Sequence, residues 1–225
     1  MIFDIISAVP DLLESPFAHS IIKRGIKARL LEINIINLRD YGIGSHNQID
    51  DYQYGGGAGM VMMVEPLDKC ISELKSMYSY EEVIYMTPDG DLFDQTTANY
   101  LSLKNRVLLI LGHYKGIDQR IRDMHVTKEI SIGEYVLSGG ELAAAVIVDA
   151  VSRLIPGVMN DGTSALTDSF QDGLLAPPVY TRPAEYKGHE VPPILLSGHD
   201  KNIEDWRTNK SIEITTKRRP DLLKD

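Results

Sequence analysis

Short, continuous apolar runs alternate with segments of helical periodicity, and this alternation restricts the possible folds more than any other feature of the chain. Residues 83–86 (VIYM) and 107–112 (VLLILG) are apolar throughout, as expected for central strands that are covered on both faces. Residues 93–103 (FDQTTANYLSL), which lie between them, have helical character. Further strand candidates are residues 2–7, 30–38 and 127–133. Strands that alternate with helices predict an α/β fold with a mostly parallel sheet.

The composition changes after Pro156. Turn-forming residues follow, then the proline-rich stretches APPVYTRP and VPPILLSG, and then a polar helical tail. We therefore expect a first domain over residues 1–158, a linker over 159–168, and a small, mainly helical C-terminal domain over 169–225. A domain of that size has a small hydrophobic core and is expected to be stabilised by contacts with a larger domain.

The formal net charge of −9 argues against a protein that binds nucleic acid over its whole surface. Two basic clusters interrupt the acidic background. The first contains Lys23, Arg24, Lys27 and Arg29, and the second contains Arg207, Lys210, Lys217, Arg218 and Arg219, with Glu213 among them. Each cluster is either a solvated face or a site for phosphate groups, and charge alone leaves both interpretations open.

We expect a cytoplasmic protein without a membrane segment. No apolar run approaches the roughly 20 residues that a membrane-spanning helix needs. The first residues lack a basic leader, so no signal peptide is expected. Cys70 is the single cysteine, which excludes an internal disulfide and suits a reducing compartment. Its neighbours have a helical pattern, so Cys70 is expected to be buried.

Three glycine-containing loops follow strand candidates: Thr87 to Gly90, Gly112 to Gly116, and Ser138-Gly-Gly-Glu141. Ligands of open α/β sheets bind outside the carboxyl ends of the strands, so the three loops together predict a pocket. None matches a dinucleotide or lysine-bearing phosphate loop, so another small molecule is expected. Ser138 and Glu141 have the spacing of a capping box. The two glycines between them serve either tight helix–strand packing or the close approach of a ligand.

The segment DDYQYGGGAGMVMMVEP, residues 50–66, has four glycines between positions 55 and 59, which excludes the interior of a strand or helix. It is either a flexible turn or a backbone surface for a flat group such as a base, flanked by Asp50 and Asp51. His46 is either a surface residue or a contact to phosphate or base.

Arg153 closes the apolar helix candidate that opens on Gly139 and Gly140, and a cation at this end interacts favourably with the helix dipole. Asp168 precedes Ser-Phe-Gln171 and has the spacing of a helix cap. Each residue alone has a structural interpretation. The histidines show no paired metal-binding spacing, so no zinc site is predicted.

Together, DDYQYGGGAGMVMMVEP, GHYKGIDQRI, SIGEYVLSGGELAAAVIVDAVSRLIPGV, DSFQDGLL and YTRP…VPPILLSGH closely resemble the bacterial tRNA (guanine-N1)-methyltransferases, which belong to the knotted SPOUT superfamily. The resemblance runs in order along nearly the whole chain. It implies a deep trefoil knot, S-adenosylmethionine as methyl donor, and tRNA as substrate. The product would be N1-methylguanosine immediately 3′ of the anticodon, at position 37. It also implies a homodimer whose active site lies at the subunit interface; no other protein partner is inferred.

The resemblance also implies roles for individual residues. Asp168 and Arg153 would be catalytic. The donor would be bound by Tyr85, Met86, Thr87, Gly112, Tyr114, Gly116, Ser131, Ile132, Gly133, Tyr135, Leu137, Gly139 and Gly140, with Gly139 and Gly140 leaving room for it. The tRNA would be contacted by His46, Asp50, Gly55, Gly56, Gly57, Gly59 and Ser169. Guanine N1 carries a proton and needs a general base, which would be Asp168, while Arg153 would stabilise the charge that develops on O6.

The chain departs from the family at two places. Many relatives have Arg-Tyr-Glu-Gly where this chain has His113-Tyr-Lys-Gly116, which leaves any requirement for Mg2+ open. Many also have an acid and a histidine in the segment written here as residues 176–180. The alternatives are a knotted methyltransferase for another RNA site, a non-catalytic RNA-binding module, and a small-molecule binding protein.

Overall fold

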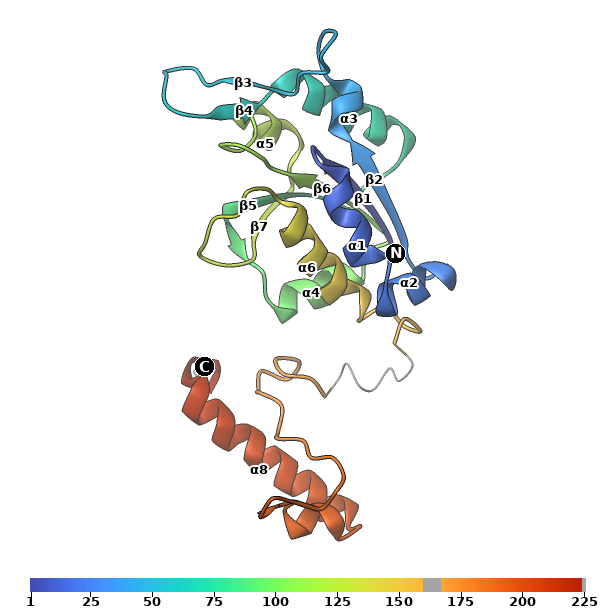
Figure 1. The fold of residues 1–225 in the computed structure, drawn as a ribbon, viewed down its shortest axis with the longest axis vertical. Coiled ribbons are helices and arrows are strands. Elements are labelled where there is room, and N and C mark those ends of the chain that lie inside the picture. Colours follow the sequence, from blue (N-terminus) through green and yellow to red (C-terminus); the bar gives the residue numbers. More distant parts are fainter. Residues whose placement is uncertain (160–166, 224–225) are drawn as a thin grey trace. The chain divides into compact units, whose positions relative to one another are not determined.

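The computed structural model describes residues 1–159 and 167–223 and divides into two compact units, Met1–Gly162 and Thr163–Asp225 (Figure 1). Most of the predicted linker, residues 159–168, lies outside the described residues. Each unit is considered by itself below.

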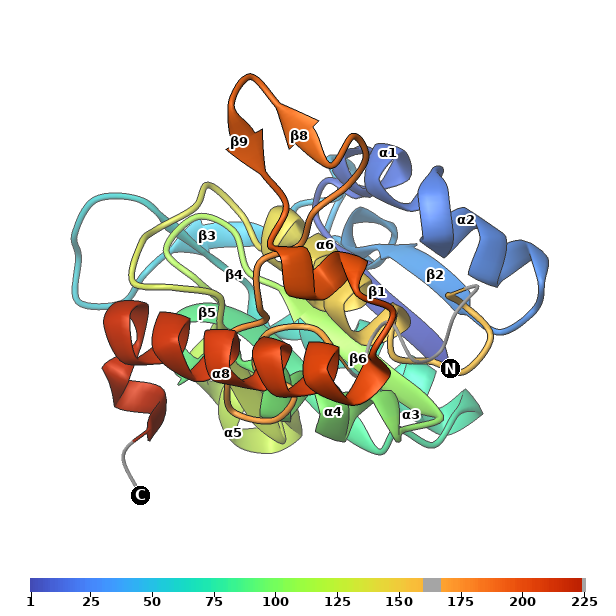
Figure 2. The ribbon, with the colours of Figure 1, turned by 90° about the horizontal axis from the view of Figure 1, so that it is seen from below.

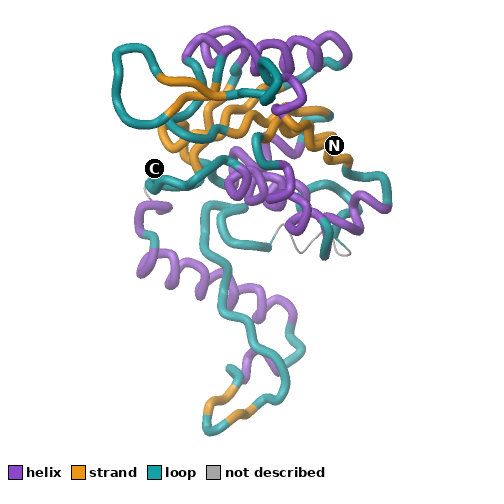
Figure 3. Tube along the Cα trace, turned by 45° about the horizontal axis from the view of Figure 1, so that its top comes forward, coloured by secondary structure: helices purple, strands orange, loops and turns teal. Residues whose placement is uncertain are grey.

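The first unit is built on a five-stranded sheet in the order β2-β1-β6-β5-β7, with every neighbouring pair parallel. The strands are β1 (Ile2–Ser7), β2 (Glu32–Asn37), β5 (Glu82–Leu92), β6 (Arg106–Leu111) and β7 (Lys128–Ser131). Figure 3 shows these strands gathered between helices. The predicted α/β class with a mostly parallel sheet is confirmed, while the knot stays a prediction.

Helices cover both faces of this sheet (Figure 1). One face carries α1 (Glu14–Phe17), α2 (Ser20–Lys27), α4 (Gln95–Ser102) and α6 (Glu141–Ser152), and the other carries α3 (Val64–Met77) and α5 (Gln119–His125). Short 3-10 helices span Pro10–Leu13 and Leu38–Tyr41. Side chains of β6 alternate between the two cores, which explains why this strand is apolar at successive positions. Cys70 is fully buried on α3, as predicted.

Strands β3 (Asp50–Tyr52) and β4 (Met60–Met62) form a small antiparallel ribbon that the sequence pattern does not predict. Its strands are three residues long, too short for a periodic pattern to be recognised. The glycine-rich segment 53–59 connects them, and all four of its glycines have positive φ. We call β3, β4 and this connection the glycine ribbon.

Strand β5 is longer than predicted. The sequence predicts a loop at Thr87 to Gly90, but β5 continues to Leu92. The pairing of β5 with β7 is irregular between Met86 and Asp91. A Cβ atom at Gly90 would lie 2.5 Å from the backbone carbon of Glu129. Gly90 therefore permits the close approach of the two strands.

The second unit contains the hairpin β8 (Glu185–Tyr186) and β9 (His189–Glu190), the 3-10 helices Pro193–Leu196 and Pro220–Leu223, and the long helix α8 (Asp200–Arg218) (Figure 2). The amide of Leu175 donates a hydrogen bond to the Thr215 hydroxyl at 2.9 Å, and the rings of Tyr180 and Trp206 lie 6.4 Å apart. These contacts hold the proline-rich segment against α8. None of the helices among the described residues combines the length and apolarity that crossing a membrane requires.

Candidate functional site

A cavity of about 410 Å3 lies at the carboxyl ends of β6 and β7 and beside the middle of β5, the strand between them. We call it the strand-end cavity. Its walls come from residues 85–89 of β5, the loop after β6 and the loop between β7 and α6. Every residue assigned from the sequence to the methyl donor lies in these walls: Tyr85, Met86, Thr87, Gly112, Tyr114, Gly116, Ser131, Ile132, Gly133, Tyr135, Leu137, Gly139 and Gly140.

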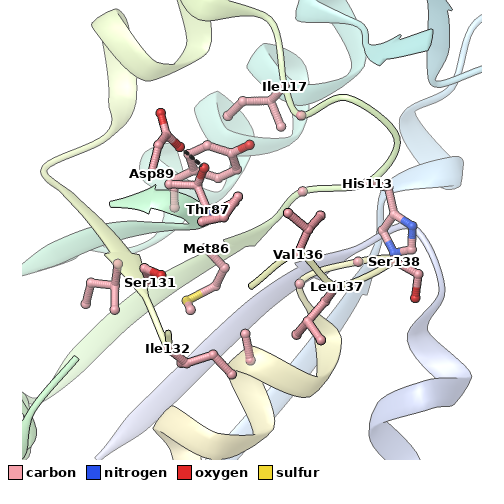
Figure 4. A pocket seen from close by; sticks show the side chains of 18 of the residues that line it. Met86, Thr87, Asp89, His113, Ile117, Ser131, Ile132, Val136, Leu137 and Ser138 are labelled. Carbon is pink, nitrogen blue, oxygen red and sulfur yellow. Dashed lines mark hydrogen bonds between the residues drawn. The ribbon is translucent and has the colours of Figure 1, made fainter. Parts of the chain in front are cut away.

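The cavity is apolar in its middle and polar at its ends. Figure 4 shows Met86, Ile132 and Leu137 gathered around the central space, with Asp89 at one end and His113 at the other. An apolar chamber with a few polar groups at fixed positions is the usual form of a small-molecule site.

Asp89 and Arg122 line the cavity but were not predicted from the sequence. An Nη atom of Arg122 lies 2.9 Å from Asp89, and Arg122 also pairs with Glu129. Hydrogen bonds from Thr87 and Arg122 hold the pKa of Asp89 below its ordinary value. The one feature of the sequence that could have indicated this pair is the presence of two arginines in GIDQRIR, residues 116–122, which begins at the end of the second glycine loop.

Tyr85 shapes the loop that follows β6. Its ring is buried, and a Cβ atom at Gly112 or Gly116 would lie 2.9 or 3.1 Å from its hydroxyl oxygen. Gly116 also has a φ of +109°, which a side chain would strain. Burial raises the pKa of Tyr85, so its hydroxyl stays protonated and serves as a hydrogen-bonding group.

The capping box predicted for Ser138 and Glu141 is wrong. The residue preceding α6 is Gly140, and no side chain caps this helix. Glu141 is 1% exposed; it accepts a hydrogen bond from the Ser7 hydroxyl at 2.6 Å and lies 2.7 Å from Nε2 of His113. Burial raises the pKa of Glu141, but the hydrogen bonds from His113 and Ser7 outweigh it, so the pKa lies below its ordinary value.

Tight packing, one of the two interpretations of Gly139 and Gly140, is supported by the structure, and their role in leaving room for the donor stays a prediction. A Cβ atom at Gly139 would collide with the His113 ring and lie 2.6 Å from a carboxylate oxygen of Glu141. At Gly140 it would lie 3.1 Å from the backbone of Leu111. Both glycines border the strand-end cavity, yet neighbouring protein atoms already exclude side chains there.

The glycine ribbon is joined to the strand-end cavity by backbone hydrogen bonds. The amide of Lys115 donates to Met60 and the amide of Met62 donates to Gly116, both at 3.0 Å. The Lys115 side chain lies along Gly59. Asp50, assigned to tRNA contact, lies near the Tyr114 hydroxyl; burial and this carboxylate raise the pKa of Tyr114. The loop that lines the cavity thus also supports the ribbon.

The remaining glycines of the ribbon face the solvent. A Cβ atom at Gly55 or Gly56 would meet nothing within 4 Å, whereas at Gly57 it would collide with the amide of Gln53. His46 is exposed in the turn that Ile43 and Gln48 close.

Arg153 and Asp168, the predicted catalytic residues, belong to different units. Arg153 follows α6 directly, at the helix end predicted from the sequence. Residues 167–174 form turns and bends, so the helix-cap interpretation of Asp168 is wrong. Ser169, assigned to tRNA contact, accepts a hydrogen bond from the amide of Ala176 at 2.9 Å.

Within the described ranges, residues 1–159 and 167–223, no three His, Cys, Asp or Glu side chains are placed to hold a metal ion. Lys115 places a cation in the cavity wall, at the position where many relatives have a glutamate.

Comparison with known proteins places this chain in a family. All residues, 1–225, match the family model described as tRNA (Guanine-1)-methyltransferase TrmD. The tRNA (guanine-N(1)-)-methyltransferase of Christiangramia forsetii is 65% identical over 225 residues, which are the whole of both chains. The protein of the same name from Cytophaga hutchinsonii is 60% identical over 222 residues, 99% of this chain and 94% of that protein. A further one, from Porphyromonas gingivalis, is 57% identical over the full length of both.

Proposed function

The chain belongs to the tRNA (guanine-N1)-methyltransferase family, and on that basis we propose that it methylates N1 of the guanosine immediately 3′ of the anticodon, position 37, with S-adenosylmethionine as donor. It is an enzyme. The observation that carries the proposal is the match of the entire chain to this family. The strand-end cavity, lined by the residues assigned to the donor, supports it.

The cavity suits the methyl donor in size and chemistry. Its volume of about 410 Å3 lies within the range of pockets that hold molecules of this size. Met86, Ile132 and Leu137 offer apolar contacts for the adenine ring, and the backbone groups of the 112–116 and 131–140 loops offer hydrogen bonds. When bound, the sulfonium of the donor supplies an electrophilic methyl group.

Asp168 and Arg153 have the chemistry that the reaction needs. In our proposal Asp168 removes the proton from N1, which frees the electron pair that bonds to the methyl carbon. A carboxylate is a weak base for this proton, so negative charge on the guanine must be stabilised. Arg153 provides a permanent positive charge for O6.

The substitution Asp168→Asn tests this assignment. It keeps the size of the side chain but removes its basicity, so we expect transfer to fall by roughly 100- to 10,000-fold, the usual contribution of a general base. Donor binding should stay within about twofold. Single-turnover transfer and calorimetric titration of the donor measure the two effects, and transfer close to the wild-type rate would remove Asp168 from the mechanism.

The glycine ribbon and the second unit supply the proposed contacts to tRNA. Asp50 and Gly55, Gly56, Gly57 and Gly59 would receive the target guanosine and its 5′ neighbour, with His46 and Ser169 nearby in the bound complex. The hydrogen-bonded connection between the ribbon and the cavity loop supports this proposal, because it ties a base-receiving element to the donor site. Because the proposed substrate is tRNA, we also propose that the protein acts in the cytoplasm.

We propose a homodimer with the active site at the subunit interface and, as in the family, a trefoil knot around the donor. One observation on the first unit supports dimerisation. Leu142 and Val146, one turn apart on α6, are 57% and 47% exposed on a helix whose other side is fully buried, and Val136 in the neighbouring loop is 83% exposed. Exposed apolar groups at helical spacing suit burial by a second chain.

The proposed function is tested by incubating the purified protein with labelled donor and unmodified tRNAs that carry either guanosine or adenosine after the anticodon. Digestion and mass spectrometry then identify the methylated atom. We expect N1-methylguanosine from the first tRNA and no product from the second. A methyl group on a ribose oxygen or at another nucleotide would contradict the proposal.

A further inference from the structure

We propose that the exposed cations of α2 and the turn after it bind phosphate groups of the tRNA, close to the nucleotide that is methylated. Lys23, Arg24, Lys27 and Arg29 form this surface, which we call the α2 basic surface. The proposal rests on the proposed function, because it specifies where that substrate is held.

The α2 basic surface is strongly positive in an otherwise acidic chain. All four side chains are exposed, and residues 20–31 contain no Asp or Glu. Lys23 and Lys27 are four residues apart and lie on the same side of the helix, where like charges repel. This arrangement destabilises the free helix slightly and becomes favourable when phosphates lie against it.

Among the described residues, Lys23, Lys27 and Arg29 of this surface make no ion pair. In the second basic cluster of the sequence, on and after α8, Lys210 pairs with Glu213, and Arg219 lies 2.6 Å from Asp221. That cluster therefore has carboxylates in its own segment, whereas residues 20–31 have none. The α2 basic surface is the one whose lysines have no local acid to compete with a phosphate.

The packing of the first unit places α2 beside the segment that follows Arg153. A Cβ atom at Gly25 in α2 would touch Val158 at 3.3 Å, and one at Gly157 would touch Leu30 at 3.1 Å. Val158 is five residues after Arg153, so the chain limits the separation of their Cα atoms to about 18 Å. Phosphates of the target nucleotide and its near neighbours lie within such a distance of the base.

The partner is identified by charge complementarity. A single strand of RNA in an anticodon loop presents regularly spaced phosphates, and point charges on flexible lysine side chains bind them without reading the base sequence. The surface is therefore expected to contribute affinity for any tRNA and to leave the choice of methylated atom to the active site.

The test is the double variant Lys23→Gln/Lys27→Gln, compared with the matched control Lys69→Gln/Lys104→Gln. The control removes an exposed lysine on α3 and a half-buried one after α4, whose ammonium lies 4.3 Å from the centre of the Tyr100 ring, and the same total charge. Binding of unmodified tRNA is measured by filter retention between 50 and roughly 300 mM salt, a range in which phosphate contacts dominate the change in affinity.

We expect the α2 variant to weaken tRNA binding by roughly 5- to 30-fold near 100 mM salt and to reduce the slope of log affinity against log salt by about 1.4 to 1.8. The control should change affinity by less than about twofold. Unchanged donor affinity and unchanged transfer at saturating tRNA would show that the α2 variant is folded.

An unaltered affinity and salt slope in the α2 variant, or an equal loss in the control, would overturn the proposal. Failure of the proposed function is distinguishable from this result, because it would appear as absence of N1-methylguanosine with the wild-type protein, whatever the salt dependence of binding.

Discussion

The strand-end cavity and the glycine ribbon both depend on glycine, but for different physical reasons. At the cavity, Gly139 and Gly140 are required because a side chain would collide with His113, Glu141 or the backbone of β6. In the ribbon, Gly55 and Gly56 face open space, and only their positive φ values, +84° and +80°, favour glycine. The first region is fixed by its contacts, and the second only by its backbone conformation.

The difference indicates separate tasks for the two regions. A cavity whose loops are held by a buried carboxylate and close packing can be complete before its ligand arrives, which limits the ordering cost of binding. An exposed glycine turn with free space around it can adjust to a large substrate. We infer that the donor site is preformed and that the ribbon changes shape around tRNA.

Among substitutions that compare these two regions, the largest effect on ligand binding is expected from Gly139→Ala. The new Cβ atom would separate His113 from Glu141 and push the 138–140 loop away from the loop after β6. Overpacking of this kind costs about 1–3 kcal/mol, which corresponds to roughly 5- to 150-fold in donor affinity if the strain falls on the bound state. Calorimetric titration of the donor measures it. Donor binding at wild-type strength would show that the loop tolerates the side chain.

An effect of similar size, on stability and not on donor binding, is expected from Glu141→Gln. The variant keeps the shape of the side chain but loses the charge that His113 and Ser7 stabilise, which should lower the free energy of unfolding by about 1.5–3 kcal/mol at neutral pH. Ser7→Ala, which removes one hydrogen bond to the same carboxylate, should cost less. Urea unfolding at pH 7 measures both.

The pH dependence of that effect follows from the lowered pKa of Glu141. A carboxylate with a depressed pKa stabilises the folded state above the pKa of the unfolded chain, about 4.3, and this stabilisation is lost as the pH falls through the folded pKa. The difference in unfolding free energy between wild type and Glu141→Gln should therefore be largest near neutrality and shrink below about pH 4. A difference that stays constant across this range would contradict the assignment.

The smallest effect is expected from Gly55→Ala. No atom lies within 4 Å of the new Cβ, so only the backbone strain of a left-handed conformation remains, about 1–2 kcal/mol confined to an exposed loop. We expect donor affinity to be unchanged and KM for tRNA to rise by a few-fold. Steady-state kinetics with each substrate varied in turn measures both effects. A loss of donor affinity in Gly55→Ala as large as that in Gly139→Ala would contradict the proposed difference between the two regions.

The sheet was predictable from the sequence, because strands β5 and β6 are covered on both faces and their apolar runs are continuous. The ribbon strands were not, since three residues on either side of a glycine loop give no periodicity. The carboxyl-end rule predicted one pocket from the three glycine loops, and the cavity lies there. The donor-binding candidates came from the family resemblance, and their binding to the donor stays a prediction.

Contacts between distant residues were beyond the reach of local patterns. The capping-box interpretation of Glu141 failed because its partners Ser7 and His113 lie 134 and 28 residues away. For the same reason the pair of Asp89 and Arg122, 33 residues apart, was missed. Asp89 and Arg122 line the cavity, and Glu141 supports its wall through His113.

The most direct test of the account is a calorimetric titration of S-adenosylmethionine in the absence of tRNA, with the wild-type protein, Gly55→Ala and Gly139→Ala side by side. A preformed donor site in the strand-end cavity predicts saturable binding that Gly55→Ala leaves intact and Gly139→Ala weakens strongly. Binding that appears only after tRNA is added, or that both variants weaken equally, would contradict it.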